Sequence, residues 1–173
     1  MDSRLRTIRT TADAEEMHSQ ILQGAANTAK WLRTFEGNPM AMLRQLRFDP
    51  IGCDPLTGQP LNIVEQLNQT FTILVSLRAV ECLIEMHPEA EGFRVALGTC
   101  QGRDVESLKP GLVSAEVFSA TSPNSNQKLK KDLARLAVDS AEHRYIFFAC
   151  PGYSAGRHET LETSQVQIFA VEP

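Results

Sequence analysis

Two acidic side chains on neighbouring predicted strands could do chemistry together. Asp104 begins one predicted strand, and Glu116 lies midway along the next, in the segment VSAEVF. Because side chains alternate between the two faces of a strand, a short turn can bring both carboxylates onto one face, with Glu106 on the same side as Asp104. Glu116 has apolar neighbours, so an ionised carboxylate there needs a compensating cation or hydrogen-bond donor. One such cation is a divalent metal such as Mg²⁺, which favours one or two carboxylates plus water and phosphate oxygens.

A polar stripe on the preceding helix could add a third carboxylate. Glu65, Gln69, Thr72 and Ser76 follow the spacing i, i+4, i+7, i+11, which places them on one side of an otherwise apolar helix. If this side faces the sheet, Glu65 approaches the two strand carboxylates. If it does not, Glu65 and Gln69 form the solvent-exposed face at the start of the helix. The spacing leaves both alternatives open.

The elements that must position these residues follow from hydrophobic periodicity and from the residues that end helices and strands. Three consecutive strands predict an antiparallel meander, and the helix after them carries the chain to a fourth strand, so that helices flank a mixed sheet. The predicted class is α/β with an α-β-β-β-α-β core. The predicted helices span residues 11–36, 39–46, 61–86 and 124–138, and the predicted strands span residues 93–97, 104–108, 112–120, 145–149 and 166–171.

The segment DPIGCDPLTGQP, residues 49–60, is dense in Pro, Gly and Asp and predicts a loop. It is the best domain boundary in the chain. We therefore expect residues 1–60 to be an N-terminal helical extension and residues 61–173 to be the core domain.

Composition restricts the class of protein. The chain has 173 residues, of which 42% are hydrophobic and 22% charged. This is enough for a sizeable core and excludes a mainly disordered chain. No uncharged apolar run reaches the roughly 18 residues that a membrane helix needs, so we expect no membrane span. The first residues, MDSRLRTIRTTADAEE, lack an apolar signal core, and the four cysteines are scattered without a C-x-x-C pair. These features predict reduced thiols in a cytoplasmic protein.

The formal net charge of −4 argues against a protein that coats nucleic acid through bulk positive charge. The charge is unevenly spread, because residues 1–47 hold seven basic and five acidic side chains, a net of +2. Arg4, Arg6 and Arg9 could form an arm that contacts nucleic acid, or they could belong to a solvated tail.

The order of elements, with its three carboxylates, resembles the common core of the restriction-endonuclease-like superfamily, the PD-(D/E)XK nucleases. Those enzymes often place a Glu on the first core helix, an Asp on the second strand and a Glu on the third. The matching residues are Glu65 in NIVEQLNQ, Asp104 in GRDVES and Glu116 in AEVF, and the resemblance covers about residues 61–171. It implies a nuclease that cleaves DNA with Mg²⁺ or Mn²⁺, in which Asp104 and Glu116 hold the metal and Glu65 supports them.

The sequence departs from the family at the lysine that usually follows the third-strand Glu by two residues, because Phe118 stands there. Phe cannot orient an attacking water or stabilise charge on a phosphate. Some members of the family supply the ammonium from the next helix, which implies Lys128 in NSNQKLKKD, although Lys128 could equally be a solvated helix lysine. Three further residues could contact substrate or phosphate, namely Asn126, Lys131 and Arg144, and Gln69 could position water or substrate.

Three functions remain open on this basis. The first is a metal-dependent nuclease. The second is a catalytically inactive domain of the same fold that binds nucleic acid or a protein partner, with Phe118 as the mark of lost chemistry. The third is a structural or assembly role, which includes a homodimer, if part of the long apolar helix is exposed. Titration with Mg²⁺ or Mn²⁺ separates the first from the second.

Overall fold

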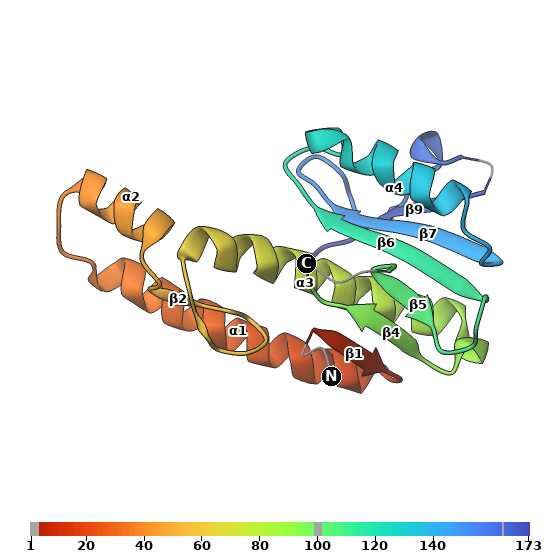
Figure 1. The fold of residues 1–173 in the computed structure, drawn as a ribbon, viewed down its shortest axis with the longest axis horizontal. Helices are drawn as coiled ribbons and strands as arrows, with labels where there is room; N and C mark the ends of the chain where they lie inside the picture. Colours follow the sequence, from red (N-terminus) through yellow and green to blue (C-terminus); the bar gives the residue numbers. More distant parts are fainter. Residues whose placement is uncertain (1–3, 99–101, 164) are drawn as a thin grey trace. The chain divides into compact units, whose positions relative to one another are not determined.

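The structure, a computed structural model, describes residues 4–98, 102–163 and 165–173. It confirms the predicted mixed α/β class. The chain forms two compact units (Figure 1). One unit, the sheet unit, contains the residues up to Ala14 together with residues 72–173, and the other, the helical unit, contains residues 15–71. The helices α1 (Thr11–Thr34) and α3 (Ile63–Met86) each contribute to both units.

In the described part of the sheet unit, seven strands form one mixed sheet in the order β1-β4-β5-β6-β7-β9-β8. β4, β5 and β6 form the predicted antiparallel meander, and β7 runs parallel to β6. β9 continues the parallel half, and β8 pairs with it in the antiparallel sense. The strands are β1 (Leu5–Ile8), β4 (Phe93–Ala96), β5 (Val105–Ser107), β6 (Val113–Ser119), β7 (His143–Ala149), β8 (Gly156–Arg157) and β9 (Gln167–Ala170).

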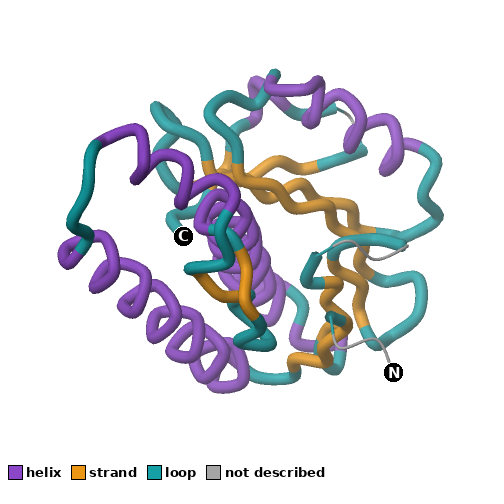
Figure 2. Tube along the Cα trace, turned by 60° about the vertical axis from the view of Figure 1, so that its left-hand side comes forward, coloured by secondary structure: helices purple, strands orange, loops and turns teal. Residues whose placement is uncertain are grey.

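Helices cover both faces of this sheet. The helix α4 (Lys128–Ala137) connects β6 to β7 and lies on the opposite side of the sheet from residues 72–86 of α3 (Figures 1 and 2). β6 is buried from Val113 to Phe118, as a strand covered on both faces should be. The core under α4 contains Phe118, Leu129, Leu136, Ile146, Phe148 and Ile168. This packing holds α4 directly over the middle of β6, where Glu116 lies.

The first strand corrects the prediction for the N-terminal arginines. Residues 5–8 form neither a free arm nor a solvated tail, because β1 is an edge strand whose register pairs Leu5 with Ala96 and Ile8 with Phe93. Ile8 is buried, and Arg9 donates from Nη1 to the carbonyl oxygen of Glu91 at 3.0 Å. The expected division of the chain into residues 1–60 and 61–173 stays a prediction. In the structure, the sheet unit includes β1, which comes from the first of these two segments.

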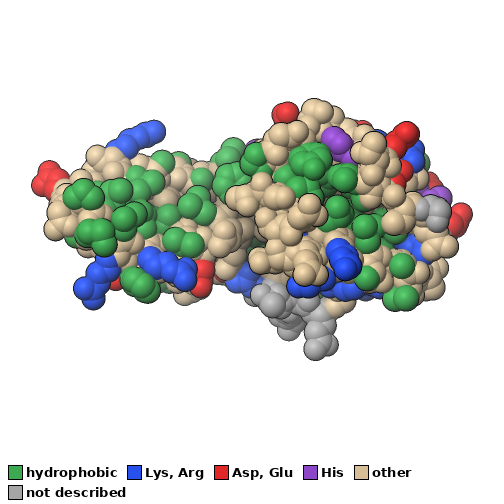
Figure 3. Space-filling view, turned by 90° about the horizontal axis from the view of Figure 1, so that it is seen from above, with side chains coloured by type: hydrophobic (Ala, Val, Ile, Leu, Met, Phe, Trp, Pro, Cys, Tyr) green, Lys and Arg blue, Asp and Glu red, His purple; other side chains and the backbone are tan. Residues whose placement is uncertain are grey.

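The helical unit consists of parts of α1 and α3, the helix α2 (Pro39–Phe48), and a short hairpin of β2 (Gly52–Cys53) and β3 (Pro60–Leu61) within the predicted loop. Asn38 caps α2 by accepting a hydrogen bond from the amide of Ala41 at 2.8 Å. Apolar side chains are exposed along α2 (Figure 3), with Met40 72%, Leu43 55% and Phe48 73% accessible. The predicted homodimer is compatible with this surface and stays a prediction.

A buried glutamine connects the three segments of the helical unit. Gln66 on α3 accepts hydrogen bonds at Oε1 from the Thr28 hydroxyl at 2.7 Å and from the Cys53 amide at 3.0 Å. We expect Gln66→Leu to lower the free energy of unfolding by about 1–3 kcal/mol, because both donors lose their acceptor. The exposed Gln23→Leu on α1 is the control and should change it by less than about 0.5 kcal/mol. Urea unfolding followed by fluorescence of Trp31, the sole tryptophan of the chain, measures both, and equal midpoints for the two variants would contradict this role of Gln66.

Two further predictions from composition concern the cysteines and the absence of a membrane span. Cys53, Cys82 and Cys150 are free thiols, while Cys100 lies outside the described residues. Among the described helices, α3 alone is long and apolar enough to cross a membrane by length and composition, and half of its most apolar window is buried inside the structure. The predicted absence of a membrane span stays a prediction.

Candidate functional site

Asp104 and Glu116 lie side by side at the centre of the sheet unit. The register that pairs Val105 of β5 with Ala115 of β6 places residue 104 opposite residue 116. Asp104 accepts a hydrogen bond at Oδ2 from the amide of Val117 at 2.8 Å, and its side chain is close enough to Glu116 to raise the pKa of Glu116. The strand positions in the sequence predict this convergence, while the role of the two residues as metal ligands stays a prediction.

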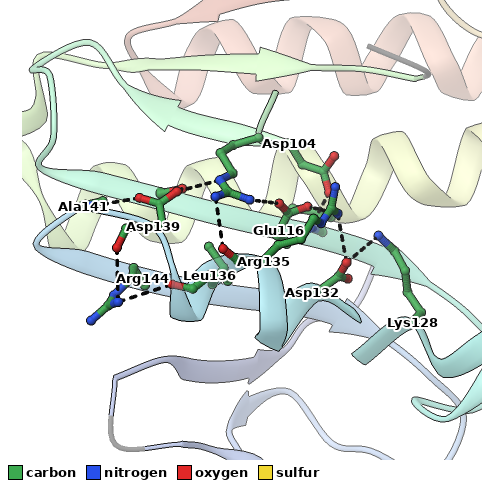
Figure 4. Close-up of polar contacts among 12 residues, drawn as sticks. Asp104, Glu116, Lys128, Asp132, Arg135, Leu136, Asp139, Ala141 and Arg144 are labelled. Atoms are coloured by element: carbon green, nitrogen blue, oxygen red, sulfur yellow. Dashed lines mark hydrogen bonds and ion pairs between the residues drawn. The ribbon is translucent and has the colours of Figure 1, made fainter. Parts of the chain in front are cut away.

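Two arginines contact the buried Glu116 (Figure 4). The side chain of Glu116 has no exposed surface. Arg103, in the segment before β5, donates from Nη1 to Oε1 of Glu116 at 3.2 Å. Arg135, on α4, donates from Nη2 to Oε2 at 2.5 Å. The sequence leaves open a cation or a hydrogen-bond donor as the compensator, and the two guanidinium groups are both.

The compensation of Glu116 is incomplete. Burial raises the pKa of Glu116 from 4.5 to about 8, and the charge of Asp104 and the hydrogen bond with it act in the same direction. Arg135 opposes this rise, and the charge of Asp132 adds to it. At pH 7 the protonated form of Glu116 therefore predominates.

Asp132 forms ion pairs with two cations of α4, Lys128 and Arg135. Asp132 is buried, and its Oδ1 accepts from Nζ of Lys128 at 2.9 Å and from Nη2 of Arg135 at 2.9 Å. The three residues follow helical spacing, so they lie on one side of α4. The other oxygen, Oδ2, is buried and has no hydrogen-bond partner among the described residues. The structure thus pairs Lys128 with Asp132 rather than with Glu116.

A second acidic residue, Asp139, holds Arg103 from the other side. Its Oδ2 accepts from Nε of Arg103 at 2.6 Å and from the Ser114 hydroxyl at 3.1 Å, and its Oδ1 accepts from the Ala141 amide at 2.8 Å. Burial acts to raise the pKa of Asp139, but these three hydrogen bonds outweigh it and lower the pKa. Asp139 and Ser114 also line part of a surface pocket of about 320 Å³. We call the linked side chains of Arg103, Asp104, Glu116, Lys128, Asp132, Arg135 and Asp139 the polar network.

The remaining predicted residues of the sheet unit surround α4. Arg144 donates from Nη1 to the carbonyl oxygens of Leu136 and Asp139, both at 3.3 Å. These hydrogen bonds stabilise the C-terminal end of α4. Lys131 is exposed on α4, and Asn126 is exposed in the turn before it with a left-handed backbone (φ 53°). Their predicted contacts with substrate stay predictions.

Glu65 and Gln69 belong to the helical unit. Glu65 is exposed in the first turn of α3, where its amide donates to Oδ1 of Asn62 at 2.9 Å. Gln69 follows one turn later and is half-buried. Both residues lie in a different compact unit from Asp104 and Glu116, so the expected support of the strand carboxylates by Glu65 stays a prediction.

Phe118 is a core residue. Its side chain is 3% exposed, and its ring stacks on that of Phe148 with 5.6 Å between centroids. Position 118 is on the same face of β6 as Glu116, because the two residues are two apart. On this face, Leu129 and Leu136 of α4 belong to the same hydrophobic cluster as Phe118.

The described residues contain no group of three or more His, Cys, Asp or Glu side chains arranged to hold a metal ion. The pair Asp104 and Glu116 nevertheless fits Mg²⁺, which usually takes one or two carboxylates and completes its shell with water. The pair also has the incomplete compensation that a cation would relieve, as the raised pKa of Glu116 indicates. Arg135 contacts Oε2 of Glu116, and its side chain is 46% exposed.

Four residues of this network are absent from the sequence prediction: Arg103, Asp132, Arg135 and Asp139. Arg103 directly precedes Asp104, and Asp132 and Arg135 follow Lys128 at helical spacing in KLKKDLAR, so a signal for these three exists. Comparison with known protein families, characterised proteins and solved structures finds no match to this chain. The resemblance to the PD-(D/E)XK nucleases is therefore neither supported nor refuted by any relative.

Proposed function

We propose that this chain is a metal-dependent nuclease that hydrolyses phosphodiester bonds, with DNA as its substrate and Mg²⁺ or Mn²⁺ as its cofactor. One observation carries the proposal: two carboxylates, Asp104 and Glu116, lie opposite each other on neighbouring strands at the centre of the sheet, and the pKa of Glu116 is raised to about 8. Strongly perturbed pKa values cluster at functional sites, where burial and like charges are placed together. The α-β-β-β-α-β order of the elements also supports the proposal of a nuclease.

The residues of the chain have distinct tasks in this proposal. Asp104 and Glu116 hold the metal, which when bound supplies a water of lowered pKa and stabilises charge on the phosphate oxygens. Glu116 must lose its proton for this, and its contact with Arg135 must open. Arg103 keeps its place, because Asp139 and the carbonyl oxygen of Arg135 also hold it, at 2.6 and 3.1 Å. Lys131 and Asn126 are exposed nearby and could contact the DNA backbone.

Calorimetric titration with Mn²⁺ or Mg²⁺ tests the proposal through the proton on Glu116. We expect the wild-type protein to bind the ion and to release up to about one proton per ion at pH 7, because Glu116 is then mainly protonated. The released proton is measured from the dependence of the binding heat on the ionisation heat of the buffer. Asp104→Asn and Glu116→Gln should each abolish both binding and Mg²⁺-dependent cleavage of plasmid DNA.

Glu106→Gln is the matched control, because Glu106 lies on β5 two residues after Asp104 but pairs with Arg94 at 3.5 Å on the surface. This variant should bind the ion and cleave as the wild type does. A wild-type protein that neither binds the ion nor cleaves DNA would overturn the proposal, and so would full cleavage by Glu116→Gln.

A specific observation favours a second candidate, a catalytically inactive domain that binds nucleic acid or a protein partner. Both oxygens of Glu116 are engaged by arginines, and the position of the expected lysine is occupied by the core residue Phe118. This candidate predicts DNA or protein binding without any metal requirement, and no heat on titration with Mn²⁺.

A further inference from the structure

Three cations contact Glu116 or its neighbour Asp132, and their contacts differ in kind. Arg103 uses Nε on Asp139, Nη1 on Glu116 and Nη2 on the carbonyl oxygen of Arg135. All three nitrogens of its guanidinium are thus engaged, and its side chain is only 20% exposed. Lys128 places its ammonium on Asp132, away from Glu116. Arg103 therefore has no guanidinium nitrogen left for a new anion, and Lys128 makes no contact with Glu116 among the described residues.

Arg135 differs from both. Its two side-chain hydrogen bonds to described residues leave from the same nitrogen, Nη2, which reaches Oε2 of Glu116 and Oδ1 of Asp132. A guanidinium has five N–H donors, so Nη1 and Nε remain for another acceptor. The side chain is 46% exposed, while its Nη2 contacts the buried carboxylates of Glu116 and Asp132.

We infer that Arg135 is the residue that binds the scissile phosphate at this site and takes the place of the lysine missing at Phe118, with Asp132 as its positioning residue. The inference rests on the proposed nuclease function and names a phosphate contact that neither the sequence nor the family resemblance assigns. Lys128, which the resemblance implies for this task, then serves to neutralise Asp132.

The position of Asp132 explains why Arg135 can exchange partners without leaving the site. Asp132 is 1% exposed and precedes Arg135 by three residues on α4, so its Oδ1 fixes the guanidinium along the helix surface. When the contact with Glu116 opens, the contact with Asp132 still holds Arg135 beside the carboxylate pair. The desolvated Asp132 would otherwise be a buried charge with one oxygen unpartnered among the described residues, which is costly unless cations face it.

Arginine also suits the chemistry. A guanidinium binds phosphate through two parallel N–H donors and stays charged at every pH at which the protein is folded. Charge developing on phosphate oxygens is stabilised best by donors that are already in place.

Binding of a fluorescently labelled DNA duplex without metal tests the inference separately from cleavage. The background is Glu116→Gln, which does not cleave under the proposal and removes the acid that competes for Arg135. Adding Arg135→Gln should weaken binding about tenfold and reduce the slope of log affinity against log salt by about one, because one phosphate contact is lost. Adding Lys130→Gln, an exposed cation of the same helix, is the control and should change affinity less than about twofold.

Two conservative variants separate binding from mere support of the fold. Arg135→Lys keeps the charge, so it should keep the salt slope while lowering affinity, since the two-donor contact is lost. Asp132→Asn should lower affinity with the slope unchanged, because it misplaces the cation without removing it. In the otherwise wild-type protein, Arg135→Gln should lower kcat for cleavage but still bind Mn²⁺ at least as tightly as the wild type, because Arg135 competes with the ion for Oε2 of Glu116.

The outcomes distinguish the two proposals. If Arg135→Gln weakens DNA binding no more than Lys130→Gln does in the Glu116→Gln background, the inference about Arg135 is wrong while the nuclease proposal stands. If the wild-type protein neither binds Mn²⁺ nor cleaves, the nuclease proposal fails. A loss of DNA affinity and salt slope specific to Arg135→Gln would support Arg135 as the phosphate contact in either case.

Discussion

The free energy of unfolding of the wild-type protein is expected to fall as the pH rises from about 5 to about 8, and Glu116→Gln is expected to remove this fall. The pKa of Glu116 is about 8 in the folded protein and near the ordinary 4.5 when unfolded, so the folded state binds one more proton within this range. A group whose folded pKa is raised stabilises the protein below its unfolded pKa, and that stabilisation is lost as the pH passes through the folded pKa. Between these two pKa values the free energy of unfolding falls by at most about 1.4 kcal/mol per pH unit.

A glutamine at position 116 imitates the protonated carboxyl, so Glu116→Gln should match the wild type near pH 5 and exceed it in stability near pH 8. Urea unfolding followed by circular dichroism at several pH values gives the difference between the two proteins, in which groups common to both cancel. Carboxyls with lowered pKa, such as Asp139, act with the opposite sign and only in more acidic solution. Glu106→Gln serves as the control and should retain the wild-type pH dependence.

A wild-type stability that is level or rising over this range, parallel to that of Glu116→Gln, would show that the two arginines compensate Glu116 completely. That result would also remove the observation on which the metal site rests. If the metal does bind, it should stabilise the wild type more near pH 8 than near pH 5, because the ion competes with a proton for the same carboxyl.

Much of the sheet unit could be predicted because its signals are local. β6 and β7 are apolar runs, and the apolar residues of α4 that face the sheet follow helical spacing, so the order of strands and the crossover can be predicted. The convergence of Asp104 and Glu116 follows from the two-residue period of a strand. β1 could not be predicted, because only Ile8 of its four residues is buried and no alternation is visible.

The partners of the two carboxylates were harder to predict, because they depend on how α4 lies across β6. From the sequence alone, Lys128 has a plausible path to Glu116, but Asp132 stands one turn along the same helix and is the nearer acid. Arg135, one turn further, is the residue that reaches Glu116. Which of the two cations reaches the strand is set by the packing of Leu129 and Leu136 in the core.

Introducing the lysine that the family pattern lacks is expected to unfold the protein rather than activate it. Phe118→Lys should lower the free energy of unfolding by about 3–5 kcal/mol, because it removes an aromatic ring from the core and buries an ammonium among apolar side chains. The ring of Phe118 stacks on Phe148, and Leu129 packs in the same cluster, so the new side chain has little room to reach Glu116. Phe118→Leu, the control, keeps the site apolar and should cost less than about 1.5 kcal/mol. Urea unfolding of both variants measures the difference, and a Phe118→Lys protein as stable as the wild type, with faster Mg²⁺-dependent cleavage, would show that position 118 opens into the site instead of the core.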